Sequence, residues 1–139
     1  MNALDFTHFL SNSLMKHGKK RKFAFLFRLF QDSLSRSKHL FLMLFVVYRL
    51  RPLTELKSTR KGSKFYFFPA PFLDKNRSFK MALRFLGKSI RSRREYTLED
   101  RVRGEIQDLF LKRGMAWAWR HELRKVCAQH MIYANYRWR

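Results

Sequence analysis

The chain has 139 residues, of which 31 are Lys or Arg and 10 are Asp or Glu, so its formal net charge is +21. Hydrophobic residues make up 46% and aromatic residues 17% of the chain, which is too apolar for a disordered basic tail. This composition predicts a single folded domain over 1–139 that needs a polyanionic partner, with nucleic acid as the first choice and an anionic membrane surface as the second.

Cysteine content and apolar runs exclude two further classes. The one cysteine, Cys127, rules out a disulfide framework within the chain. The longest apolar run, 40–48, is shorter than the about 20 residues that a bilayer-spanning helix needs. Residues 1–10 resemble neither a secretory signal nor an Arg-rich transit peptide. We therefore expect that the protein is made where it works or that a leader has been removed.

The apolar spacing of the first third predicts three helices, over about 5–17, 19–35 and 38–50. The first ends near Gly18, and the second is apolar around most of its surface, as is typical of a buried helix. By periodicity alone the third segment could be a strand. We interpret it as a helix that Pro52 ends.

Residues 53–69 show a different pattern. An extended segment, a polar turn at 58–63 and an aromatic second arm at 65–68 predict a β-hairpin with a cationic tip. Pro69 and Pro71 are expected to end it. Phe67 on this hairpin, like Phe85 further along, is interpreted as a core residue rather than a base-stacking one.

Three further helices are predicted, over about 74–94, 97–113 and 119–134, followed by a tail. Asp74 is a good N-cap for the first, and Thr97 followed by Asp100 resembles a capping box for the second. The predicted fold class is therefore mainly α, a bundle of about six helices with a protruding β-hairpin arm between the third and fourth.

Catalysis is poorly supported by the sequence. Acidic residues are scarce, and most sit among Arg and Lys on expected helix faces. They are Glu99, Asp100, Glu105 and Asp108. We interpret them as i to i+4 partners and caps. The chain has no P-loop, no nucleotide-binding glycine run and no nucleophile elbow, so we predict no enzyme and no cofactor.

One group of residues raises the question of a metal site. Cys127 and His130 are one helical turn apart, and His121 lies upstream. A structural zinc site usually has four ligands, often in CxxC-type pairs, and this chain offers a single thiol. We therefore predict a packed cysteine near a surface histidine and no metal.

Basic residues interleaved with aromatic ones indicate the function. They form four clusters: the segment 15–22, the hairpin tip, the helix over 74–94, and the C-terminal part of the chain. Lys and Arg contact phosphates, and planar side chains stack on bases. The candidate RNA-binding residues are Lys16, Lys19, Lys20, Arg21, Lys22, Lys57, Arg60, Lys61, Lys64, Tyr66, Lys75, Arg77, Arg84, Lys88, Arg91, Arg93, Arg94, Arg113, Trp119, Arg120, Arg137 and Trp138.

Several motifs, in order along the chain, resemble a known family. They are Met-Lys-x-Gly-Lys-Lys at 15–20, RPLTELKSTRKGSKFYFFPAPF at 51–72, SFKMALRFL at 78–86, LKRGMA at 111–116 and NYRWR at 135–139. Together they make the chain similar to the small-subunit ribosomal protein seven family of bacteria and organelles, over about Phe6 to Trp138. The closing motif and the Lys-Arg-Gly stretch look most like plant and protist mitochondrial members.

The resemblance implies a fold of six helices with a hairpin arm and a structural, non-enzymatic role. It implies binding to the 3′ major domain of small-subunit rRNA and organisation of the subunit head. The implied partners are neighbouring ribosomal proteins of the head and platform, with exit-site tRNA and mRNA near the hairpin and C-terminal segment. It also implies a mitochondrial ribosome as the location and no membrane. The alternatives are a basic protein that binds a membrane surface and a DNA-binding regulator.

The chain departs from the family pattern after Gly114. Where the family carries two or three Lys, only Arg120 matches, with Ala118 and Trp119 in the other places. The family's Asn-Arg before the final segment is His-Met at 130–131 here. We therefore expect the fine contacts of the C-terminal third to differ from those of other members.

Overall fold

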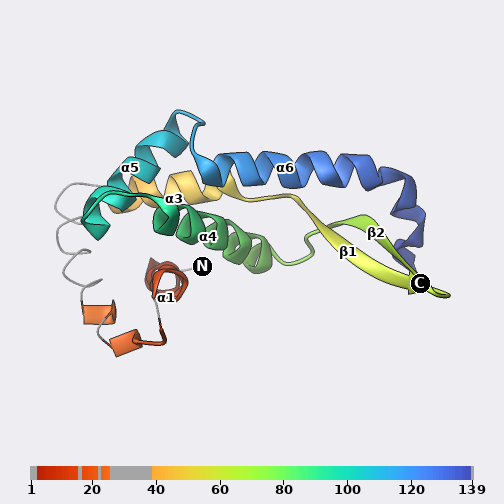
Figure 1. The fold of residues 1–139 in the computed structure, drawn as a ribbon, viewed down its shortest axis with the longest axis horizontal. Coiled ribbons are helices and arrows are strands. Elements are labelled where there is room, and N and C mark those ends of the chain that lie inside the picture. The colour runs from red at the N-terminus through yellow and green to blue at the C-terminus, as the bar shows by residue number, and fades with distance from the viewer. Residues whose placement is uncertain (1–2, 16, 22, 26–38, 139) are drawn as a thin grey trace.

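The computed structural model describes residues 3–15, 17–21, 23–25 and 39–138, with side chains over 8–15, 17–21, 23–25 and 44–136. The described elements are α1 (Ala3–Leu14), α3 (His39–Leu50), β1 (Thr54–Lys61), β2 (Lys64–Pro71), α4 (Lys75–Ser92), α5 (Leu98–Phe110), α6 (Met115–Gln129) and the 3-10 helix η1 (His130–Trp138) (Figure 1). The described chain is mainly helical, with an antiparallel hairpin between α3 and α4, which confirms the predicted fold class.

The helices α1, α3, α4, α5 and α6 form what we call the body. The helix α4 packs against the other four, because its apolar residues recur at helical spacing on one side. Leu83, Leu86 and Ile90 on this stripe are completely or almost completely buried. They meet buried side chains of the other helices, such as Leu10 and Val47. The core therefore lies around α4, as its sequence pattern predicts.

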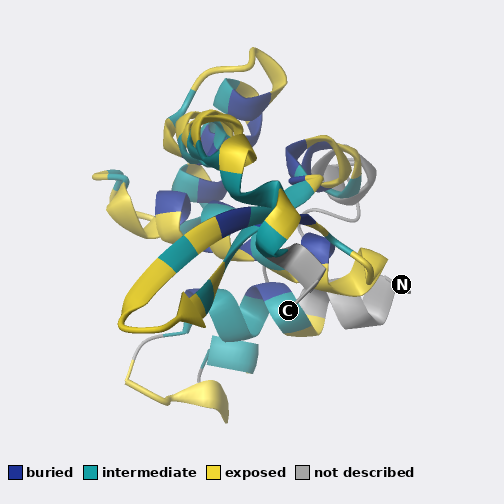
Figure 2. Cartoon of the chain, turned by 90° about the vertical axis from the view of Figure 1, so that its right-hand side faces the viewer, coloured by how far each residue is buried: buried dark blue, intermediate teal, exposed yellow. Residues whose placement is uncertain are grey.

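The hairpin and η1 form what we call the arm, which projects from one end of the body (Figure 1). The strands pair in register from Thr54 opposite Pro71 to Lys61 opposite Lys64, with a turn between them. Gly62 in this turn has φ of 64°, a left-handed conformation that glycine adopts without strain. The tip is exposed (Figure 2), and η1 packs along β2.

The hairpin corrects two expectations. Pro69 was expected to end the second strand, but it pairs with Leu56 and the strand continues to Pro71. A proline is tolerated here because both strands of a two-stranded hairpin are edges, where a missing N–H can face solvent. Phe67, expected in the core, is 46% exposed, because successive side chains of a strand point to opposite faces and the covered face is the one that carries Phe68 and Ala70.

The last helix differs from its expected range of 119–134. The helix α6 begins at Met115, after Gly114 at φ of 90°, and its first turn is closed by a hydrogen bond from Ala118 N to Gly114 O at 3.2 Å. It ends at Gln129, and the chain continues as the 3-10 helix η1 where the sequence predicted the end of a helix and a tail. The chain thereby turns from the end of α6 toward the hairpin, where η1 lies against β2 (Figure 1).

The two expected helix caps differ in detail. Thr97 caps α5, since its Oγ1 accepts a hydrogen bond from Asp100 N at 3.1 Å, as the capping-box pattern predicts. Asp74 occupies the N-cap position of α4, but its side chain makes no capping hydrogen bond.

Of the predicted helix over 19–35, residues 20–21 and 23–25 are helical, and the rest lies outside the described residues. No helix in the described part of the chain is long and apolar enough to span a membrane.

Candidate nucleic-acid interface

Three of the scarce carboxylates form a cluster that we call the Arg93 cluster. Arg93 joins Glu95 at 2.9 Å, Glu105 at 3.0 Å and Asp108 at 2.6 Å. Glu105 is 1% exposed, and its second oxygen accepts a hydrogen bond from Ser89 Oγ at 2.6 Å. Burial by itself lowers the pKa of Arg93, but its hydrogen bonds to Asp108, Glu95 and Glu105 outweigh this and raise the pKa above its usual value.

The cluster changes the interpretation of two acidic residues. Glu105 and Asp108 were interpreted as i to i+4 partners or caps, but both bind Arg93, which follows α4 and lies outside their own helix. Glu99 does pair with Arg103 at i to i+4. The guanidinium of Arg93 is thus engaged inside the protein, and its predicted contact with RNA stays a prediction.

A second carboxylate fixes the base of the arm. Glu55 on β1 is 8% exposed and binds Arg77 of α4 at 3.0 Å and Lys57 at 3.3 Å. Beside it, Ser78 Oγ donates to Pro52 O at 2.8 Å and accepts from Arg51 Nε at 3.2 Å. The start of β1 is therefore tied to the first turn of α4.

Most predicted RNA-binding residues lack such partners. Within the described residues, the following make no ion pair: Lys19, Lys20, Arg21, Arg60, Lys61, Lys64, Lys75, Arg84, Lys88, Arg91, Arg94, Arg113 and Arg120. All of them are exposed except Arg120, which is half-buried. Because uncompensated surface cations raise the local positive potential, these residues are suited to a polyanion.

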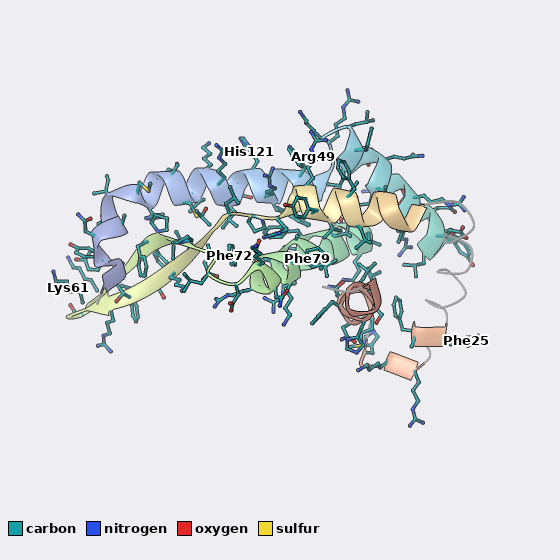
Figure 3. The ribbon with its side chains drawn as sticks, turned by 180° about the vertical axis from the view of Figure 1, so that it is seen from behind. Phe25, Arg49, Lys61, Phe72, Phe79 and His121 are labelled. Carbon is teal, nitrogen blue, oxygen red and sulfur yellow. The ribbon has the colours of Figure 1, made fainter. Side chains whose placement is uncertain are left out.

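The structure brings the hairpin tip and the C-terminal segment together. The Tyr66 ring lies 5.5 Å from the ring of Tyr133 and 5.2 Å from that of Tyr136. Lys61 Nζ lies 5.0 Å from the Tyr136 ring, at the end of the molecule labelled in Figure 3. Arg60 lies over Phe65 at 5.9 Å. Two predicted clusters that are distant in sequence thus form one surface of cations and rings.

The basic cluster on α4 and the C-terminal basic cluster also meet. Lys88 Nζ of α4 lies 4.6 Å from the ring of Trp119 on α6. On the same helix, the Arg120 guanidinium lies 4.7 Å from the Trp117 ring, and its Nε donates to Arg51 O at 3.4 Å. These cation–aromatic contacts orient the basic groups across the α4–α6 face.

The N-terminal basic turn stands apart from these surfaces. Lys19, Lys20 and Arg21 are exposed after a turn in which His17 and Gly18 have φ of 53° and 67°. This segment leads to the end of the molecule opposite Lys61, as the labels on Phe25 and Lys61 show in Figure 3. Over the described residues, the predicted interface is therefore spread across several surfaces rather than gathered in one patch.

Comparison with known proteins identifies the family. A family model described as Ribosomal protein S7p/S5e matches residues 5–130. The chain belongs to this family. The resemblance noted in the sequence is thereby confirmed, and the match runs from within α1 through the hairpin to the end of α6 in this S7p/S5e chain.

Curated bacterial relatives named "Small ribosomal subunit protein uS7" match as well. The Roseobacter denitrificans and Geotalea uraniireducens proteins are each 34% identical over 89 residues, which is 64% of this chain and 56% of the relative. The Nitratiruptor sp. protein is 28% identical over 131 residues, 91% of this chain and 83% of the relative. In the first two matches the chain thus spans about half the length of the relative.

Four candidate residues of this S7p/S5e chain cannot be placed. The side chains of Lys16, Lys22, Arg137 and Trp138 lie outside the described residues, although the backbone of 137–138 belongs to η1.

Among the residues that are described, no three His, Cys, Asp or Glu side chains gather as metal ligands would. Cys127 is buried, and the ring of His130 lies 6.1 Å from that of Phe67.

Arg49 and Arg124 were not among the candidate RNA-binding residues predicted from the sequence. Burial, followed by the charges of Arg124 and Arg49, lowers the pKa of Arg120, so the three arginines share one region. Arg124 had a signal in the sequence, because it follows Arg120 by one helical turn. Arg49 had none, since only folding brings the last turn of α3 beside α6.

Proposed function

We propose that this chain is a structural, non-enzymatic protein of the small ribosomal subunit that binds the 3′ major domain of its rRNA and organises the head. Family membership supports the ribosomal role, as do relatives named as small-subunit proteins. The observation that carries RNA binding is the set of exposed Lys and Arg side chains without ion pairs among the described residues, which occur after α1, at the hairpin tip, on α4 and before α6.

The mechanism is electrostatic and geometric. Packed helices hold cationic faces in fixed relative positions, so several phosphate backbones are contacted at once without a further loss of conformational freedom. The arm extends this set of contacts beyond the body. The rings of Tyr66, Tyr133 and Tyr136 hold the C-terminal segment against the hairpin. This shared surface supports a position of both segments near exit-site tRNA and the mRNA path.

Charge reversal at the hairpin tip tests rRNA binding. We expect Lys61→Glu with Lys64→Glu to weaken binding to the 3′ major domain far more than the matched pair Lys112→Glu with Lys125→Glu, which changes charge equally. Both pairs are exposed. Filter binding at several salt concentrations measures the effect, and the wild type should lose about 10³–10⁵ in affinity between about 50 and 200 mM salt for 6–10 phosphate contacts. A flat salt response contradicts the mechanism.

The proposed location is a mitochondrial ribosome. Its support is the resemblance of the Lys-Arg-Gly stretch at 112–114 and of the closing Tyr-Arg-Trp-Arg to mitochondrial members. The relatives reported above are bacterial and do not bear on the location. Gradient sedimentation of lysed mitochondria tests it. We expect the chain to co-sediment with the mitochondrial small subunit, together with proteins of the head and platform, and recovery with another ribosome would contradict the location.

A further inference from the structure

A hollow lies between α6 and the base of the hairpin. Its volume is about 300 Å³, at the lower end of the about 300–1,000 Å³ that small-molecule sites occupy. Arg120 and Arg124 of α6 line one part of it, and Pro52, Leu53 and Pro69 of the hairpin base line another. The hollow therefore offers a cationic wall and an apolar wall to one occupant.

The cationic wall lacks a counter-charge. Neither Arg120 nor Arg124 has an ion pair among the described residues, and the nearby carboxylate Glu122 does not line the hollow. Arg49, in the last turn of α3, adds a third positive charge that acts on Arg120. Partial burial, followed by repulsion from Arg124 and Arg49, lowers the pKa of Arg120, and an anion in the hollow would offset this repulsion.

The apolar wall is exposed at the mouth of the hollow. Leu53 is 80% exposed and Met131 is 65% exposed, although both line the hollow. A bare phosphate held by the arginines would leave this apolar surface in contact with water. An occupant that joins a phosphate to a flat, weakly polar group would cover both walls.

We propose that this hollow binds one unpaired nucleotide of RNA, with its phosphate on Arg120 and Arg124 and its base against Leu53 and Met131. The inference rests on the proposed rRNA-binding function. The nucleotide must be unpaired, because a base in a duplex does not present its face to a protein. The hollow then recognises a bulged or looped nucleotide through its shape as well as its charge.

Binding of a short fluorescent oligouridine to the full chain tests the cationic wall. We expect Arg124→Ala to weaken binding about tenfold, since it removes charge-assisted hydrogen bonds to phosphate. The matched control, Lys125→Ala, removes the same charge from the next residue on α6, outside the hollow, and should cost at most about threefold. Equal losses in the two variants would overturn the proposal while leaving general RNA binding intact.

A second pair of variants tests the apolar wall. Leu53→Ser should weaken binding of oligouridine but not of the same oligonucleotide with abasic sites. Leu73→Ser is the control, because Leu73 is 89% exposed and lies outside the hollow. Equal behaviour of Leu53→Ser on both oligonucleotides would show that no base reaches this wall and would overturn the proposal.

Two further measurements separate a nucleotide site from a simple anion site. Uridine monophosphate should compete with oligouridine at lower concentration than inorganic phosphate, and equal competition would overturn the proposal. Photocrosslinking with 4-thiouridine should label the peptide containing His121 or Met131, which line the hollow. If the wild-type chain and Lys125→Ala both fail to bind any RNA, the proposed function itself fails.

Discussion

The body and the arm of this protein are held together by different interactions. In the body, Val47, Leu86 and Val102 are completely buried around α4. In the arm, burial is confined to the base, and toward the tip Phe65 is 65% exposed. There, strand register and contacts such as Tyr66 with Tyr136 define the structure. The comparison teaches that burial stabilises the body, whereas the arm keeps its cations and rings at the surface.

The largest loss of stability is expected from breaking the Arg93 cluster in the body. Arg93→Met leaves the buried carboxylate of Glu105 without its cation, which should lower the free energy of unfolding by about 3–5 kcal/mol. Urea denaturation followed by circular dichroism measures this. Arg94→Met is the control, since Arg94 is exposed and has no ion pair among the described residues, so its effect should stay within about 0.5 kcal/mol.

A double variant sharpens this prediction. Removing the charge of Glu105 together with that of Arg93, as Glu105→Met with Arg93→Met, eliminates the unpaired buried charge. The double variant should therefore be more stable than Arg93→Met alone. A double variant as unstable as the sum of both single ones would mean that the cluster acts through packing, as the close approach of Arg93 to Gly104 would allow.

Truncation in the apolar core is expected to be the next largest effect. Leu86→Ala removes a fully buried side chain of α4 and should lower the free energy of unfolding by about 2–5 kcal/mol through lost burial and the cavity left behind. Leu73→Ala removes the same atoms from a residue that is 89% exposed and should have almost no effect. Similar losses in both variants, by urea denaturation, would contradict a core centred on α4.

The same contrast explains what could be predicted from the sequence. The apolar residues of α4 recur at helical spacing, and the hairpin consists of two extended arms joined by a polar turn. Both elements were therefore predicted from local patterns. The four basic clusters were also visible, because charge is a property of the residues themselves. The sequence did not show which of these clusters lie together in the fold, since contacts such as Lys88 with Trp119 join residues that only folding brings together.

The wrong predictions for Glu105 and Phe67 share a physical cause. Glu105 sits on a predicted helix among basic residues, and nothing local distinguishes a buried ion pair with Arg93 from an exposed i to i+4 pair. Phe67 is as apolar as its buried neighbour Phe68, but it points to the opposite face of β2 and is 46% exposed. In both cases the partner that covers or binds the side chain comes from a distant part of the chain, which the residue type at one position does not encode.

The junction between body and arm should respond more weakly than the core. Glu55→Gln removes the charge that binds Arg77 and Lys57, whose side chains are 63% and 41% exposed. Because solvent screens these pairs, the free energy of unfolding should fall by only about 1 kcal/mol. Hydrogen exchange should increase at the start of β1 while the amides of α4 beyond its first turn stay protected. Unchanged exchange in β1 would mean that Glu55 does not fix the arm.

The smallest effect on overall stability is expected from the ring contacts of the arm. Tyr66→Ala removes the contacts with Tyr133 and Tyr136, and each such ring pair is worth about 0.5–1.5 kcal/mol. We expect the arm to open locally while the body stays folded, so that most of this loss does not reach global stability. The free energy of global unfolding should change by less than about 0.5 kcal/mol. Hydrogen exchange should increase in β2 and η1 together, since η1 packs along β2.

The neighbouring residue supplies the control for this last prediction. Phe65 projects to the other face of β2, is 65% exposed and contacts Arg60 rather than η1. Phe65→Ala should therefore leave the exchange of η1 unchanged while Tyr66→Ala increases it. If both variants released η1 equally, strand pairing and not the tyrosine contacts would hold the C-terminal segment. The shared surface of cations and rings would then depend on the backbone of the hairpin alone.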